Sequence, residues 1–177
     1  AIGIGIDIMQ PKGKMIIDIG GGDSRFVDIL FELGFKSLFV LDISAESLKK
    51  AKTRLGDKAT LITWIESNVL DFETNKHFDI WHDRATFHFL TKKEDISKYI
   101  ELANLLIKPN GYLIISTFST NGPQKCSGLD ITQYSEDSIK KIFGGKFKHI
   151  KSFEQVHTTP FNTKQNFIYS IFKKSNY

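Results

Sequence analysis

Three consecutive glycines, residues 20–22, follow the apolar run at residues 15–19, and one acid, Asp18, stands just before them. A glycine turn lets the chain reverse sharply and lets a ligand approach the backbone without a Cβ in the way. If a helix follows the turn, its free N–H groups can bind an anionic group, and Asp18 would attract a cationic one. Asp42 lies about 20 residues further on, where an acid accepts ribose hydroxyls. Together these residues predict a site for a charged, nucleotide-like cofactor.

Other residues that could contact a ligand also follow apolar runs. Ile43 comes directly after Asp42, and Asn68 and Val69 come after the run at residues 61–65. Side chains able to accept a proton or to hold an anion follow later runs, at Asp83, Arg84, His88 and His157. His88 lies among aromatic residues and also fits a core position, and Arg84 could pair with Asp83. We expect any catalytic group to come from this set.

A sheet is needed to bring these residues together. Apolar runs typical of buried strands occupy residues 15–19, 37–41, 61–65, 77–82, 112–118, 147–156 and 166–172. Stretches with helical spacing separate most of the early runs, which predicts a parallel sheet covered on both faces. Residues 108–111 are expected to form a turn before the fifth strand. The last two runs leave no room for a crossover helix, so they must pair antiparallel as an edge hairpin.

In such a sheet, ligands bind beyond the carboxyl ends of the strands. The segments expected at that edge are residues 20–24, 42–44, 67–69, 82–90, 117–134 and 157–163. They contain nearly all the candidate residues named above. We expect one domain over residues 1–177, in which residues 1–13 are a lead-in broken by glycine and proline and form a shortened N-terminal segment.

The glycine spacing distinguishes between two classes of cofactor. A dinucleotide fold requires G-x-G-x-x-G, but counting from Gly20 places Arg25 where the third glycine permits close helix packing. The spacing acid-x-Gly-x-Gly is kept by Asp18, Gly20 and Gly22, with Ser24 next in the series. In this respect the sequence resembles the class I S-adenosylmethionine-dependent methyltransferases, whose first motif is acid-x-Gly-x-Gly-x-Gly.

The resemblance covers nearly the whole chain from residue 14 and implies S-adenosylmethionine as the cofactor. It also implies a Rossmann-like doubly wound α/β sheet of seven strands, mostly parallel, in the order 3-2-1-4-5-7-6. Under this resemblance the acid before the glycines faces the cofactor ammonium, the loop N–H groups its carboxylate, and the acid after the second strand its ribose. The residues that the resemblance assigns to the cofactor are Asp18, Gly20, Gly21, Gly22, Asp42, Ile43, Asn68, Val69 and Asp83.

Three stretches are similar to those of a small-protein subgroup of this family, comparable in size to the tellurite- and thiopurine-type enzymes. They read W-H-D-R-A-T-F-H-F-L (81–90), G-P-Q-K-C-S-G-L (122–129) and H-T-T-P-F-N-T-K-Q-N-F (157–167). The resemblance implies methyl transfer by in-line displacement to an acceptor, which we expect to be a small molecule ahead of a protein side chain. A NAD(P)-dependent oxidoreductase and a non-catalytic adenosyl-binding module remain as alternatives.

Composition narrows the possible partners and the compartment. The chain has 177 residues, of which 41% are hydrophobic and 25% charged, and its net charge of +4 does not favour nucleic acid. No apolar run approaches the roughly 20 residues that a membrane helix requires. The single cysteine, Cys126, excludes an internal disulfide and favours a reducing compartment, so we expect a cytoplasmic protein. No spacing of metal ligands is present, and no metal is expected.

Overall fold

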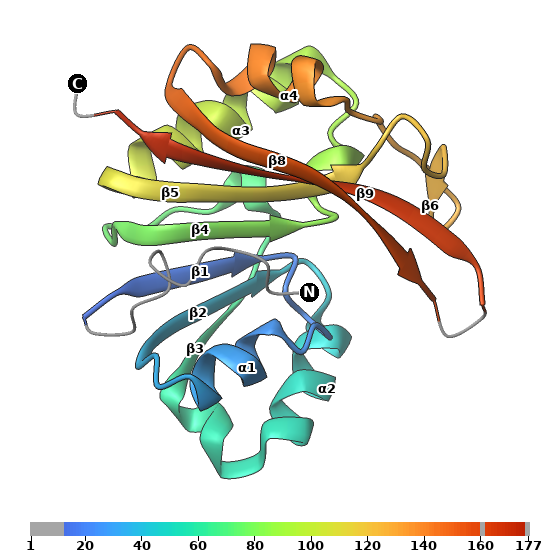
Figure 1. Ribbon diagram of the computed structural model, residues 1–177. Helices are drawn as coiled ribbons and strands as arrows, with labels where there is room; N and C mark the ends of the chain where they lie inside the picture. The colour runs from blue at the N-terminus through green and yellow to red at the C-terminus, as the bar shows by residue number, and fades with distance from the viewer. Residues whose placement is uncertain (1–12, 160–161, 176–177) are drawn as a thin grey trace.

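Figure 1 shows the computed structural model, which describes residues 13–159 and 162–175. Except for Gly13, the predicted lead-in at residues 1–13 lies outside the described residues. Seven strands form one sheet in the order β3-β2-β1-β4-β5-β9-β8. Their bounds are β1 (Met15–Ile19), β2 (Ser37–Asp42), β3 (Ile62–Glu66), β4 (Phe78–Arg84), β5 (Ile107–Phe118), β8 (Phe147–Thr158) and β9 (Lys164–Lys174).

The pairing within the sheet is parallel up to β5 and antiparallel beyond it. β1 pairs parallel with β2 and β4, whereas β9 pairs antiparallel with both β5 and β8. The predicted doubly wound sheet, its strand order and its edge hairpin are therefore confirmed. The helices of the described residues are α1 (Phe26–Glu32), α2 (Ala45–Leu55), α3 (Lys93–Leu106) and α4 (Glu136–Phe143), with short 3₁₀ turns η2 (Gly56–Leu61), η3 (Val69–Asp71) and η4 (Phe87–Phe89).

Strand alternation divides the core into two layers. Ile16 of β1 belongs to a cluster with Val27 of α1, whereas Ile17 belongs to a cluster with Tyr99 of α3. Figure 1 shows α1 and α2 on one side of the sheet and α3 and α4 on the other. Because successive strand residues point to opposite faces, Asp18 lies on the same face as Ile16, towards α1 and α2.

One predicted turn is wrong. β5 begins at Ile107 and includes residues 108–111, where a turn was expected. Asn110 has a φ of 63°, and the pairing of β4 with β5 shifts register between Phe78 and Ile80. The Pro, Asn and Gly residues therefore create an irregularity within the strand, comparable to a bulge, and do not interrupt it.

The polar segment after β5 contains a small hairpin that the sequence reading missed. β6 (Lys125–Cys126) pairs antiparallel with β7 (Leu129–Asp130). Ser127 and Gly128 form the connection, with φ values of 51° and 81°. A two-residue turn with positive φ at both positions matches the right-handed twist of the two strands. The Ser-Gly pair was the local signal for this turn.

The outer hairpin extends past the end of β5. Phe118, the last residue of β5, pairs with Phe167, so the first residues of β9 lie beyond the neighbouring strand. We call residues 153–158 and 164–169 the hairpin arm. Register pairs such as His157 with Gln165 share one face of this arm. Phe118, Phe167 and Tyr169 form a separate small core there, against which Cys126 of β6 packs.

Candidate cofactor and substrate site

The glycine loop after β1 is held by the end of β2. The N–H groups of Gly20 and Gly21 both donate to the Leu41 carbonyl, at 2.7 and 3.3 Å, and the N–H of Gly22 donates to Asp42 Oδ2 at 2.9 Å. Gly20 has a φ of 66°, and a Cβ there would lie 1.8 Å from Thr86 Oγ1. The predicted donors for a bound carboxylate are thus used within the protein, because the loop folds back onto β2.

Asp18, on β1 just before this loop, is paired with a histidine. Its Oδ1 lies 2.6 Å from Nδ1 of His82, the residue beside it on β4. His82 is itself held by the ring of Phe26, with a centroid separation of 4.0 Å. Asp18 is only 3% exposed, and its Oδ2 has no hydrogen-bond partner among the described residues. A buried carboxylate oxygen without a donor favours a cationic or hydrogen-bonding ligand group.

Asp42 links the second strand to both the glycine loop and α2. Its Oδ2 accepts the N–H of Gly22, and its Oδ1 accepts the N–H of Ser44 at 2.8 Å. A Cβ on Gly22 would lie 2.6 Å from Asp42 Oδ2, so glycine is required for this close approach. Each carboxylate oxygen has a second lone pair, and the side chain still lines the main cavity. Asp42 can therefore accept ligand hydroxyls from a fixed position.

The main cavity has a volume of about 680 Å³ and lies at the carboxyl ends of the strands. This size is typical of small-molecule sites. It brings together Asp42, Ile43, Asn68 and Val69, all of which were predicted to contact the cofactor. Further lining residues come from other elements: Gly20, Leu41, Ser67, Ala85, Thr86, Phe89, Leu90, Leu129 and Asp130.

The walls of this cavity suit a flat ring. Ile43 is 71% exposed and Leu129 is 61% exposed, although both are large apolar side chains. Asn68 Oδ1 accepts the N–H of Leu70 at 2.9 Å and caps η3. Its amide NH₂ group stays available as a donor. The arrangement can hold an aromatic ring between apolar side chains and read its edge with the Asn68 amide.

A second, smaller cavity of about 180 Å³ shares Gly20 and Ala85 with the first. Asp18 and Ser24 line its inner side. The outer side is formed by the end of β4, the β6 hairpin and the arm, through Arg84, Phe118, Cys126, Gln165 and Phe167. Burial raises the pKa of the Cys126 thiol, which therefore stays neutral.

The two cavities meet at a strained turn. Ala85 has a φ of 68°, which a residue with a Cβ seldom adopts. Its N–H donates to the Ser116 carbonyl at 2.9 Å, which ties the end of β4 to β5. Strained backbone of this kind persists only where the surroundings hold it, and it gathers at ligand sites. The geometry therefore describes one elongated site with a large and a small compartment.

Comparison with known proteins identifies the class to which this site belongs. A family model described as a methyltransferase domain matches residues 10–175. The chain belongs to this methyltransferase domain family. The methyltransferase family expected from the sequence is thereby confirmed.

Individual relatives agree with the family. The chain is 33% identical over 113 residues to malonyl-[acyl-carrier protein] O-methyltransferase of Anoxybacillus flavithermus, an alignment covering 63% of this chain. It spans only 41% of that relative's length. N-methyltransferase NodS of Bradyrhizobium japonicum WM9, in complex with S-adenosyl-L-homocysteine, has a TM-score of 0.75 at 17% identity, over 91% of this chain and 78% of that one.

A second solved structure holds a small-molecule acceptor. It is 1,6-didemethyltoxoflavin-N1-methyltransferase of Burkholderia thailandensis, with bound 1,6-didemethyltoxoflavin and S-adenosylhomocysteine. Its TM-score is 0.72 at 17% identity, over 92% of this chain and 71% of that chain. At such identity the likeness establishes a shared fold. The small-protein subgroup, the single domain over residues 1–177 and the cytoplasmic location stay predictions.

Of the four predicted catalytic residues, Asp83, His88 and His157 line neither cavity. Asp83 is fully buried on the face of the sheet that α3 covers. Its Oδ1 accepts the N–H groups of Thr86 and Phe87, and its Oδ2 accepts the Tyr99 hydroxyl at 2.6 Å. Burial raises the pKa of Asp83 to about 6. Strand alternation turns Asp83 away from the ligand side that Asp18 faces. Its predicted contact with ligand is therefore not supported, and it shapes the turn that carries Thr86.

His88 is also a core residue in this structure. It has no exposed surface, and its Nδ1 accepts the N–H of Phe118 at 3.3 Å. Burial lowers the pKa of His88 to about 4, so the ring is neutral at physiological pH. Its Nε2 has no partner among the described residues. The core position, which the sequence left open as an alternative, is the one that the structure supports.

Arg84 lines the small cavity, and His157 lies near it because both side chains contact Phe167. The Arg84 guanidinium is 5.5 Å from the centre of the Phe167 ring, and the His157 ring meets Phe167 edge-on at 6.3 Å. Partial burial lowers the pKa of His157, and the charge of Arg84 lowers it further. The neutral imidazole is therefore the dominant form at pH 7. Of the four catalytic candidates, Arg84 lines the small cavity and His157 contacts its lining residue Phe167.

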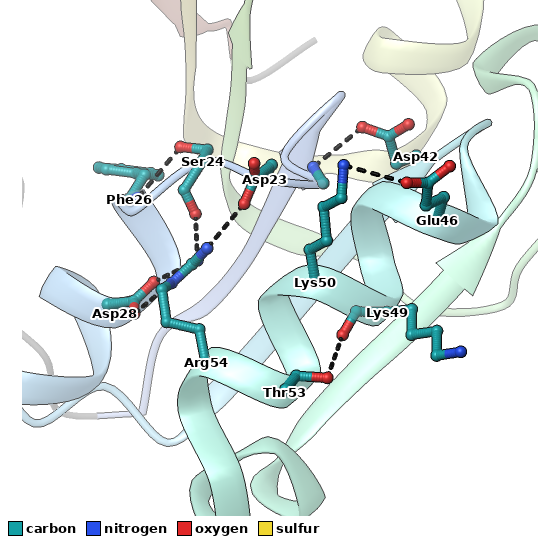
Figure 2. Close-up of polar contacts among 11 residues, drawn as sticks. Asp23, Ser24, Phe26, Asp28, Asp42, Glu46, Lys49, Lys50, Thr53 and Arg54 are labelled. Atoms are coloured by element: carbon teal, nitrogen blue, oxygen red, sulfur yellow. Dashed lines mark hydrogen bonds and ion pairs between the residues drawn. The ribbon is translucent and has the colours of Figure 1, made fainter.

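A residue that sequence reasoning missed holds the glycine loop from outside. Arg54 of α2 donates from Nε and Nη2 to the two carboxylate oxygens of Asp28, at 3.0 and 2.8 Å. Nη2 also donates to the Ser24 carbonyl at 2.8 Å, and Nη1 to Asp23 Oδ1 at 2.9 Å. Figure 2 shows this cluster joining α1, α2 and the loop, with Asp42 nearby. Such long-range pairs leave no local signal in the sequence.

The described residues contain neither a candidate membrane-spanning helix nor a candidate metal site. No helix in residues 13–159 or 162–175 has the length and apolar character needed to cross a membrane. In the same residues, no three side chains of the His, Cys, Asp or Glu type are placed to hold a metal ion.

Proposed function

We propose that this methyltransferase binds S-adenosylmethionine across the two cavities and transfers its methyl group to a small-molecule acceptor by in-line displacement. The observation that carries the proposal is the joined site, in which Asp42 and Asn68 line the large compartment and Asp18 lines the small one. The shared residues Gly20 and Ala85 provide the passage between them. A nucleoside joined to a charged amino acid has this elongated shape.

The residues present fit the cofactor chemically. Asp42 would accept the ribose hydroxyls, Ile43 would pack on the adenine face, and the Asn68 amide would meet the adenine edge. The orphaned Oδ2 of Asp18 supports binding of the cofactor's ammonium group. When bound, the cofactor supplies a methyl group on a sulfonium, which needs no covalent help from the protein. The chain's own contribution is to orient the reactants and to exclude water.

His157 is the residue we infer to remove a proton from the acceptor, where the acceptor is protonated. Its lowered pKa leaves the imidazole free to accept a proton at neutral pH. It shares a face of the arm with Gln165, a lining residue of the small cavity. Asp83 and His88 lack this access. A test is the pH profile of kcat/KM, whose acidic limb should disappear in His157→Gln.

The small compartment, of about 180 Å³, would hold the amino-acid end of the cofactor, so only a small acceptor, or the reacting end of a larger one, would find room beside it. A protein-linked acceptor is the second candidate, because a relative is named for malonyl-acyl-carrier protein. An acyl group carried on a flexible linker would present a small reacting end to the small compartment.

Calorimetry with S-adenosylhomocysteine and NADH tests the cofactor. Binding of S-adenosylhomocysteine without binding of NADH is expected, and the reverse would favour the oxidoreductase alternative. Turnover is then followed as S-adenosylhomocysteine release across a panel of small thiols, amines, carboxylic acids and acyl-carrier-protein conjugates. Cofactor binding without release from any acceptor would favour a non-catalytic adenosyl-binding module.

A further inference from the structure

Two opposite charges line the small compartment, and each keeps hydrogen-bonding capacity, although Oδ1 of Asp18 is already paired with His82. Asp18 is buried at its inner side with Oδ2 unpartnered, and Arg84 is exposed at its outer side. Within the described residues, no carboxylate forms an ion pair with Arg84; its guanidinium lies over the Phe167 ring. That stacking fixes the plane of the guanidinium and leaves its N–H edge available for a planar anion.

The glycine loop cannot supply the anion site expected of it. The N–H groups of Gly20, Gly21 and Gly22 already donate to Leu41 and Asp42. A ligand carboxylate in this region therefore needs another donor. Among the described residues that line either cavity, Arg84 carries the only positive charge.

The two charges also stand in the right relation to the large compartment. Gly20 and Ala85 line both cavities, so a ligand whose nucleoside occupies the first would extend past them into the second. An α-amino acid carries its ammonium and its carboxylate on one carbon. A cavity with an unpartnered carboxylate oxygen on one side and an unpaired guanidinium on the other complements such a zwitterion.

We propose that Arg84 binds the carboxylate at the amino-acid end of the cofactor, opposite Asp18, which binds its ammonium. This inference rests on the proposed function and assigns Arg84 to donor binding, where the sequence suggested a catalytic role. It explains how the methyltransferase can bind the cofactor although its loop N–H groups are used internally. It also leaves His157 as the base proposed above for the acceptor.

A comparison of two ligands isolates this contact. S-adenosylhomocysteine carries the amino-acid group, and 5′-methylthioadenosine lacks it. Arg84→Met should raise the calorimetric Kd of S-adenosylhomocysteine about tenfold, the effect of losing one charged hydrogen bond. The Kd of 5′-methylthioadenosine should change less than about twofold. Arg84→Lys, which keeps the charge but loses the fork, should give an intermediate Kd for S-adenosylhomocysteine.

Arg25→Met is the matched control, because Arg25 follows the same loop but lines neither cavity. It should leave both Kd values unchanged. Equal weakening of both ligands by Arg84→Met would mean that Arg84 only supports the cavity wall and would overturn the proposal. An unchanged Kd for both ligands would overturn it too. Wild-type protein that binds neither nucleoside would instead refute the proposed function.

Discussion

Replacing Arg54 by methionine tests how the glycine loop is held. The arginine bonds both oxygens of Asp28 and the Ser24 carbonyl, and both charged side chains are 23% exposed. Charged hydrogen bonds in buried sites contribute about 1.5–3 kcal/mol, and exposed ion pairs less than about 1 kcal/mol. The partial exposure places this cluster between these limits. We therefore expect Arg54→Met to lower the free energy of unfolding by about 2 kcal/mol.

Urea unfolding at pH 7 measures this loss, with Lys50→Met as the matched control. Lys50 lies one turn earlier on α2 and pairs with Glu46, but these side chains are 60% and 77% exposed. Such a pair at i,i+4 contributes about 0.3–0.5 kcal/mol. S-adenosylhomocysteine binding should weaken several-fold in Arg54→Met only, because only Arg54 holds the loop carbonyl at Ser24.

The pH dependence provides a second signature. The hydrogen bonds from Arg54 hold the pKa of Asp28 below its usual value of 3.8. A carboxylate whose pKa is lowered in the folded state stabilises the fold fully when the pH is above its unfolded pKa. This contribution is lost as the pH falls through the folded-state pKa. The gap between wild type and Arg54→Met should therefore be full at pH 6 and shrink towards pH 3. If Arg54→Met and Lys50→Met lose the same small amount at pH 7, the cluster is an ordinary surface ion pair and the reasoning is wrong.

Three further predictions concern single positions. Gly22→Ala would bring a Cβ to 2.6 Å from Asp42 Oδ2, so it should destabilise by about 1–3 kcal/mol in thermal unfolding, whereas Gly145→Ala, with open space around it, should change little. Asp42→Ala should raise the calorimetric Kd of S-adenosylhomocysteine at least tenfold, and the exposed Asp71→Ala should not. Because burial raises the pKa of Asp83 to about 6, wild type should lose about 2 kcal/mol relative to Asp83→Asn between pH 4 and pH 7 in urea titrations; a constant difference would contradict this.

Local patterns in the sequence were enough to predict the sheet. Apolar runs alternating with helical spacing indicated the strands, and the short connection before the last run required an antiparallel hairpin. The rule that ligands gather at carboxyl ends brought Asp42, Ile43 and Asn68 to one cavity. These predictions succeed because periodicity and chain connectivity are local properties of the sequence. The same reasoning missed the β6–β7 ribbon, although its Ser-Gly turn is also local.

Only the tertiary structure decided which polar groups face a ligand. Register sets Asp18 beside His82, 64 positions away, and strand alternation turns Asp83 to the opposite face. The loop N–H groups donate to β2, which no motif indicates, and among the described residues that line the two cavities Arg84 is then the one cation. A motif specifies residue types and spacing along the chain. The partner that each polar group finds depends on side chains brought together from distant strands, so it is fixed only when the sheet has formed.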